Sequence, residues 1–105
     1  MGLAERQQQF IAETGVAFSY VIILNKDASA NPPAADTAAA YAGLVGATYP
    51  VLADPTDGVA SASPWNGTTL PGKCVVAPDM TILTCWTGHG EDTVGYDAIK
   101  NHAGM

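Results

Sequence analysis

The residues best suited to chemistry in this sequence are its two cysteines, Cys74 and Cys85. They lie on two short apolar runs, KCVVA and TILTCW, and the Pro-Asp pair between the runs predicts an antiparallel hairpin. With a four-residue loop over 78–81, Cys74 lies directly opposite Cys85, close enough for a disulfide. With a three-residue loop, Cys74 lies opposite Thr84 and Cys85 points to the other face. Because the two cysteines form no C-x-x-C motif, they indicate no redox compartment by themselves.

No other group of residues has the spacing of a catalytic or metal site. His89 and His102 each lack a nearby second ligand, so we expect exposed histidines and no metal. The DPTDG segment, residues 54–58, does not have the ligand spacing of a calcium loop and is typical of a turn. Asn66 begins a glycosylation sequon, which has meaning only on a secretory route. The sequence also has no glycine-rich phosphate loop, and we expect no cofactor.

The elements that position the cysteines follow from hydrophobic patterning and helix-stop signals. In order, we expect a helix ending at Gly15, a strand over 16–24, a helix over 34–45 ending at Gly46, an extended segment before residue 54, the hairpin, and a helix over 91–104. The run VAFSYVIIL is nearly continuous in apolar residues, which is typical of a parallel strand covered on both faces. Such a strand needs neighbours on both edges and helices above and below, so the predicted fold class is α/β.

Two of the helices are expected to bury an apolar face. The face predicted for the second helix consists of Ala38, Tyr41, Leu44 and Val45. The face predicted for the last helix consists of Val94, Ala98 and Ile99. A chain of 105 residues has room for a single domain, 1–105, with one modest core.

Composition excludes some classes of partner. The net charge is −6 and the basic residues (Arg6, Lys26, Lys73 and Lys100) are scattered, so we expect no nucleic acid binding. No apolar run reaches the roughly 18 residues of a membrane span, and the start MGLAERQQQF does not have the pattern of a signal peptide. We expect a soluble protein with no membrane contact and assign no compartment. Hydrophobic residues make up 48% of the chain and charged residues 13%, which favours a homo-oligomer.

Four segments carry a resemblance to a known family: the strand ending in LNKD, TYPVLADPTDGVA, LPGKCVVAPDMTIL, and the glycine of WTG. Together they resemble a thioredoxin-fold protein of the redoxin type, the group of peroxiredoxin-like and thiol-disulfide oxidoreductase domains. The resemblance covers nearly the whole chain and implies a thioredoxin-like three-layer sandwich. It implies that Pro71, after Leu70, is the cis-proline of a substrate-binding loop that Gly72 completes. The family's hairpin favours the shorter loop, so we expect Cys74 and Cys85 to be free, buried thiols with little reactivity.

The chain departs from the family's pattern at three places. Gly72 follows the proline where threonine is usual, and Met80 occupies the glycine position of the hairpin turn. A non-glycine residue in a left-handed conformation costs roughly 1 kcal/mol or more, which predicts a wider turn. The family's C-x-x-C motif and the central strand before it are both absent, and we expect them to precede Met1 in a longer product, as cysteine or selenocysteine. The expected fold is thus an N-terminally truncated one: helix, parallel strand, helix, β-hairpin and C-terminal helix.

The resemblance implies a function in thiol–disulfide exchange or peroxide reduction, with a protein thiol substrate or a thioredoxin-type reductant as partner. Because the nucleophile is missing, we expect the chain by itself to be inactive. The alternative is a degenerate thioredoxin-like module for binding or assembly, because loss of the central strand leaves strand edges that a second copy would pair. A third hypothesis is that Cys74 and Cys85 act as a relocated redox pair.

Overall fold

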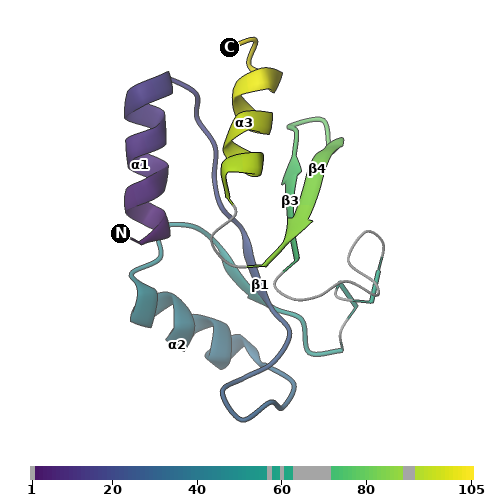
Figure 1. Cartoon of the computed structure of the whole chain (residues 1–105). Helices are drawn as coiled ribbons and strands as arrows, with labels where there is room; N and C mark the ends of the chain where they lie inside the picture. The colour runs from purple at the N-terminus through teal and green to yellow at the C-terminus, as the bar shows by residue number, and fades with distance from the viewer. Residues whose placement is uncertain (1, 57, 60, 63–71, 89–91) are drawn as a thin grey trace. The chain divides into compact units, whose positions relative to one another are not determined.

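The computed structural model describes residues 2–56, 58–59, 61–62, 72–88 and 92–105. The chain divides into two compact units, Met1–Ala62 and Ser63–Met105, and each is described by itself. The first unit contains α1 (Leu3–Thr14), β1 (Ile22–Leu24), α2 (Ala35–Val45) and β2 (Val51–Ala53). The second contains β3 (Gly72–Val76), β4 (Ile82–Thr87) and α3 (Thr93–His102) (Figure 1). The class is mixed α/β, as predicted, and the order of elements is the expected one.

Glycines end both helices of the first unit. Gly15 after α1 and Gly46 after α2 have φ angles of 73° and 63°, in the left-handed region that glycine adopts without steric cost. The Gly15 N–H donates to the Ile11 carbonyl at 2.8 Å, which satisfies one of the carbonyls left free at the helix end. Both predicted helix stops are therefore confirmed.

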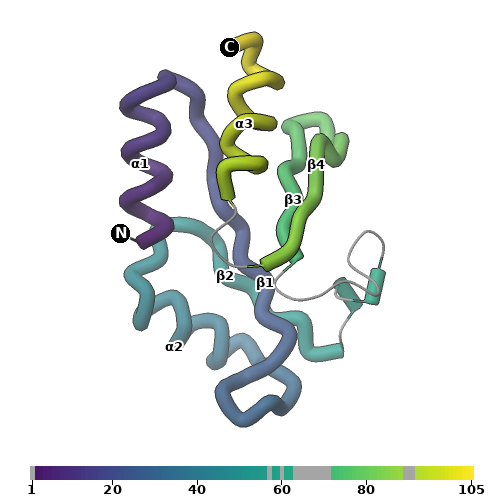
Figure 2. Tube along the Cα trace, viewed as in Figure 1, coloured from purple at the N-terminus to yellow at the C-terminus, as the bar shows by residue number. Residues whose placement is uncertain are grey.

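Four aromatic rings connect α1 to the segments that lead into the first sheet. Phe10 of α1 packs edge-to-face on Phe18, Phe18 on Tyr20, and Tyr20 on Tyr49, with centroid distances of 5.2, 5.1 and 5.5 Å. Each such pair stabilises by roughly 0.5–1.5 kcal/mol beyond the area it buries. Tyr49 is buried, and this burial raises the pKa of its hydroxyl. Phe10 and Tyr49 are buried in the core of the first unit, and Phe18 and Tyr20, on the segment between α1 and β1 that Figure 2 traces, connect them.

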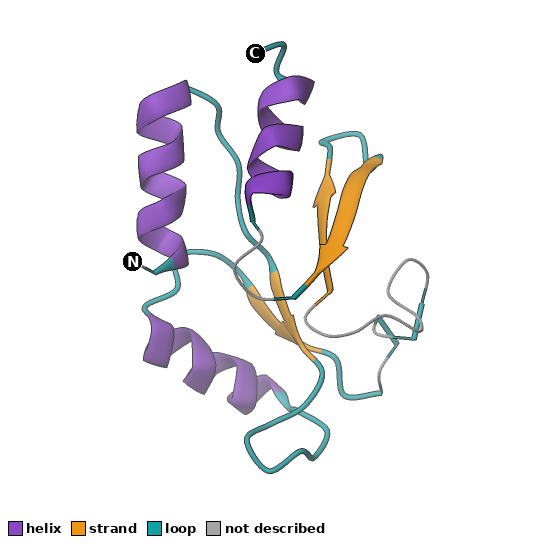
Figure 3. Cartoon of the chain, viewed as in Figure 1, coloured by secondary structure: helices purple, strands orange, loops and turns teal. Residues whose placement is uncertain are grey.

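The first sheet consists of two short parallel strands, β1 and β2, joined through α2 (Figure 3). Ile22 lies opposite Val51, and the register continues to Leu24 opposite Ala53. The predicted strand over 16–24 is wrong in length, because β2 offers only three residues to pair with. Among the residues that the structure describes, neither strand has a second partner.

The prediction that this strand is covered on both faces is also wrong. Val21, Ile23 and Leu52 share one face of the sheet and are 55%, 40% and 50% exposed. The residues that alternate with them, Ile22, Leu24, Val51 and Ala53, are half-buried. One face of the sheet is therefore covered and the other carries exposed apolar side chains.

The predicted buried face of α2 is confirmed at Ala38 alone. Tyr41, Leu44 and Val45 are exposed, Leu44 at 85%. The reason is the size of the sheet: α2 packs on β2, and a three-residue strand spans about 10 Å. An eleven-residue helix is about 16 Å long, so part of α2 extends past the strand.

In the second unit, α3 packs on one face of the hairpin. Gly95 is buried under the indole of Trp86, whose Nε1 is buried and has no hydrogen-bond partner among the described residues. Ala98 and Ile99 are half-buried, as expected for the packed face. Val94 is exposed, so its predicted place on that face is wrong, because Gly95 occupies it.

The close approach of Trp86 to α3 depends on the missing side chain at Gly95. A Cβ added there would lie 2.9 Å from Cζ2 of the indole and closer still to Cη2, so the ring and helix would have to separate. We expect Gly95→Ala to lower the free energy of unfolding by roughly 1–3 kcal/mol, measured by urea denaturation.

Gly43 provides the matched control, because it lies inside α2 and an added Cβ would meet nothing within 4 Å. Gly43→Ala should raise the free energy of unfolding by up to about 1 kcal/mol through helix propensity. Equal effects of the two substitutions would show that Trp86 does not require the glycine.

Candidate redox site

The hairpin turns through a three-residue loop, Pro78 to Met80. The Ala77 N–H donates to the Thr81 carbonyl at 2.8 Å, and the Met80 N–H donates to the Ala77 carbonyl at 2.8 Å. Met80 adopts a φ of 72°, so the turn is tight and the predicted wider turn is wrong. The two backbone bonds, and a third from the Thr81 N–H to Asp79 Oδ1 at 3.0 Å, offset the roughly 1–2 kcal/mol cost of a left-handed methionine.

A β-bulge then changes the register of the strands. Val76 lies opposite Ile82, but Val75 lies opposite Thr84, so Leu83 is the extra residue of β4. The bulge moves β4 by one residue, and Cys74 consequently lies opposite Cys85. The shorter loop is therefore confirmed, although the consequence expected from it is not.

Cys74 and Cys85 form a disulfide, and the expectation of two free thiols is wrong. Their Cα atoms are 4.1 Å apart, near the about 4.5 Å between opposite residues of a non-hydrogen-bonded antiparallel pair. The cysteines are separated by 11 positions, and a bridge closing a loop of this length contributes roughly 3 kcal/mol in the chain-entropy model. The bulge brings the two cysteines opposite each other, and no local pattern in the sequence marks it. The sequence therefore predicts free thiols where the structure has a disulfide.

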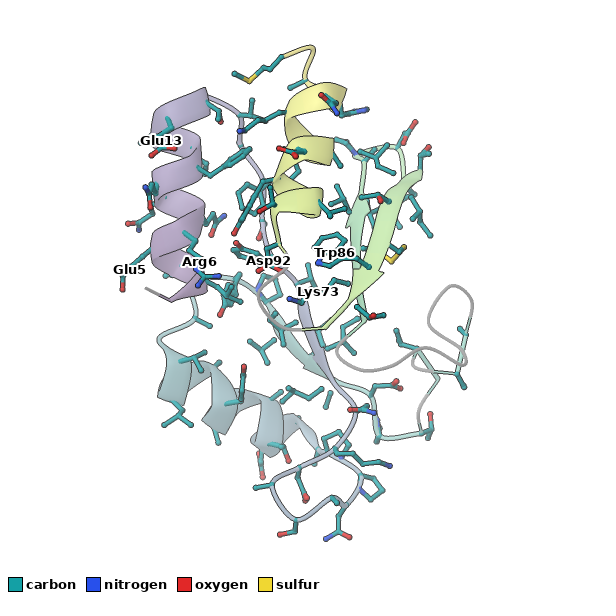
Figure 4. All side chains as sticks on the ribbon, viewed as in Figure 1. Glu5, Arg6, Glu13, Lys73, Trp86 and Asp92 are labelled. Atoms are coloured by element: carbon teal, nitrogen blue, oxygen red, sulfur yellow. A yellow bond between two sulfur atoms is a disulfide. The ribbon has the colours of Figure 1, made fainter. Side chains whose placement is uncertain are left out.

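The two faces of the hairpin differ in chemistry. On the face toward α3, Trp86 covers Gly95, and the Lys73 ammonium Nζ lies 2.6 Å from Oδ1 of Asp92, the residue before α3 (Figure 4). Both partners of this ion pair are largely shielded from solvent. Cys74 and Cys85 alternate with Lys73 and Trp86 along the strands, so the disulfide lies on the opposite face.

The outer face of the hairpin, defined by Cys74, Val76, Ile82, Cys85 and Thr87, is apolar and open. Cys74 is half-buried, whereas the other four residues are exposed. None of the five carries a charge. The disulfide therefore lies on an exposed face of the hairpin, and Cys85 is the more exposed residue of the pair.

The substrate loop expected at 70–72 is described at its last residue. Gly72 is the first residue of β3, opposite Thr87, and alternation places it on the same face as Cys74. Leu70 and Pro71 lie outside the described residues, as do His89 and the sequon at Asn66.

His102 ends α3 and is exposed, as predicted. The described part of the chain contains no cluster of three His, Cys, Asp or Glu side chains that could hold a metal ion.

Asp54, in the DPTDG segment, has a role that the sequence did not indicate. Its carboxylate is buried and accepts the N–H groups of Gly58 and Val59 at 2.8 and 2.9 Å, while its own N–H donates to the Leu24 carbonyl. The predicted turn is confirmed. The two carboxylate bonds hold the loop after β2, and the main-chain bond to Leu24 connects the end of β1 to the residue after β2.

No family model matches this chain, and no curated protein or solved structure is significantly similar to it. None of the helices in the described ranges is both long enough and apolar enough to cross a membrane.

The turn of this hairpin should respond to pH through Asp79. Hydrogen bonds from the backbone N–H and then the side chain of Thr81 lower the pKa of the Asp79 carboxyl. Because the pKa is lowered in the folded state, the ionised carboxylate stabilises the turn at pH values above the ordinary pKa of about 3.9. This contribution is lost as the pH falls through the lowered pKa. NMR titration should give Asp79 a pKa below that of an unfolded control peptide.

Thr81→Val removes the side-chain hydroxyl but keeps the backbone donor, so the pKa of Asp79 should rise part of the way. A pKa of Asp79 equal to the peptide value in the parent chain would contradict this account of the turn.

Proposed function

We propose that this chain is a thioredoxin-like domain of the redoxin type whose role is thiol–disulfide exchange with a protein thiol. The observation that carries the proposal is the continuity between the expected substrate loop and the disulfide. Gly72, the last residue of that loop, opens β3 two residues before Cys74, on the same open face. The parallel β1–β2 pair joined through α2, followed by the hairpin and α3, supports it as the expected order of elements.

In this proposal the chain provides the side of the site that faces the substrate. Leu70 and Pro71 hold the substrate backbone, and the outer face of the hairpin receives the adjoining side chains. The 105 residues contain no C-x-x-C motif, so they provide no nucleophile of the family's kind. The chain alone should therefore reduce insulin or peroxide far more slowly than an enzyme that carries the motif.

Binding at the loop is the direct test. A short peptide with an S-methylated cysteine, which cannot exchange sulfur, should shift the amide NMR signals of Gly72 and Lys73. Pro71→Ala should weaken this binding at least tenfold, because the loop loses the residue proposed to hold the substrate backbone.

Pro55→Ala, in the turn after β2, is the control and should leave the affinity unchanged. Absence of binding, or equal affinity of the Pro71→Ala variant, would overturn the proposal.

A second candidate function, a thioredoxin-like module for binding or assembly, is favoured by the exposed face of the first sheet. Ile23 and Leu52 are paired on the two short strands, Val21 directly precedes β1, and all three are exposed. Exposed apolar faces and open strand edges favour association with another chain. A second copy of this chain is the proposed partner, with the two sheet faces in contact.

Sedimentation tests this second candidate. The parent chain should be a dimer or larger at micromolar concentration, and Leu52→Glu should shift it toward monomer by placing a charge in the contact. Leu44→Glu makes the same change at an exposed leucine of α2, away from the sheet face, and should leave the assembly intact. A monomeric parent chain would exclude assembly through this face.

A further inference from the structure

We infer that the Cys74–Cys85 disulfide is itself a redox-active bond that exchanges with a protein dithiol, and that the sulfur of Cys85 is the atom attacked. The inference rests on the proposed role in thiol–disulfide exchange and names the atom through which this chain takes part. It is carried by the unequal exposure of the two cysteines, by the chemistry of the surrounding face, and by packing of the hairpin that does not involve the bond.

The two cysteines are unequally exposed. Cys85 is exposed, whereas Cys74, directly opposite on β3, is half-buried. Exchange begins when a thiolate attacks one sulfur of the bond, and steric access helps to decide which sulfur that is. Attack therefore falls on Cys85, and Cys74 is the leaving group.

The surrounding face favours a protein dithiol over a small anionic thiol. Val76 and Ile82 lie opposite each other beside the disulfide, on the side of the loop, and are 46% and 47% exposed, and no charged residue belongs to the outer face. The nearest cation along β3, Lys73, points to the other face, where it pairs with Asp92. Glutathione, an anion, would meet no positive charge on this face of an acidic chain, whereas a protein dithiol with an apolar rim would bury Val76 and Ile82.

The hairpin has contacts that hold it when the bond is open. The loop bonds between Ala77 and Thr81, the contact of Trp86 with Gly95 and the Lys73–Asp92 ion pair do not involve sulfur. After reduction, the strand pairing keeps the two thiols on opposite residues. The bond can consequently re-form without a folding step.

The exchange balances as a two-electron transfer. A thiolate of the partner attacks the Cys85 sulfur, forms a mixed disulfide and releases the Cys74 thiolate, which takes up a proton. The partner's second thiol, as thiolate, then attacks the sulfur of the partner's first cysteine, forms the partner's disulfide and releases the Cys85 thiolate, which is also protonated. The partner dithiol is oxidised to a disulfide, and Cys74 and Cys85 are reduced to thiols.

The first experiment compares the two sulfurs. In the Cys74→Ser variant the remaining thiol is Cys85, and in the Cys85→Ser variant it is Cys74. With Ellman's reagent, Cys85 should react at least tenfold faster than Cys74 at the same pH. Equal rates, or a faster Cys74, would overturn the assignment of the attacked sulfur.

The second experiment measures reduction of the oxidised parent chain by a reduced thioredoxin, used as the probe protein dithiol, and by glutathione. At equal thiol concentration thioredoxin should be at least tenfold faster, as followed by alkylation and mass spectrometry. Val76→Glu should slow the thioredoxin reaction severalfold. Val94→Glu, at a residue of α3 that is 45% exposed and off the outer face, should not change the rate. A bond that resists thioredoxin, or equal effects of both variants, would overturn the inference.

The indole N–H signal of Trp86 reports whether the hairpin persists after reduction. The chemical shift of this signal should be unchanged in the reduced chain. Loss of the signal would show that the hairpin needs the disulfide to stay folded, contrary to the inference. Failure of peptide binding at the loop of residues 70–72 would count against the proposed substrate site without altering these sulfur rates. The two outcomes are therefore distinguishable.

Discussion

The register of the hairpin is the constraint on which the chemistry of this chain depends. A three-residue loop alone would place Cys74 and Cys85 on opposite faces, where they could not meet. The extra residue in β4, Leu83, moves the pairing by one position and brings the two sulfurs together. One bulged residue thus decides whether the chain has two isolated thiols or one accessible disulfide.

The same register places the packing contacts on one face of the hairpin and the disulfide on the other. Trp86 and Lys73 face α3, where Gly95 lets the indole approach the helix backbone and Asp92 pairs with the ammonium group. These contacts stabilise the second unit without sulfur. The disulfide can therefore lie on a face that is open to a partner, which is the arrangement that exchange chemistry requires.

The first unit shows the effect of a narrow sheet. Its aromatic chain runs from Phe10 to Tyr49, and the bond from the Asp54 N–H to the Leu24 carbonyl joins the ends of two three-residue strands. Two such strands are too small to cover an eleven-residue helix, and apolar residues on the sheet and on α2 remain exposed. A surface of this kind is consistent with the proposed association of two copies and with the high apolar content of the sequence.

The sequence by itself determined the helices, their glycine stops at Gly15 and Gly46, the turn at residues 54–58 and the existence of the hairpin, because these depend on local propensity and backbone conformation. It did not determine the length of β1, the exposure of Leu44 or the disulfide. Strand length is set by the partner strand, burial by the size of the packed surface, and the cysteine pairing by a bulge whose stability comes from the whole hairpin and α3. These are non-local interactions, which only the tertiary structure decided.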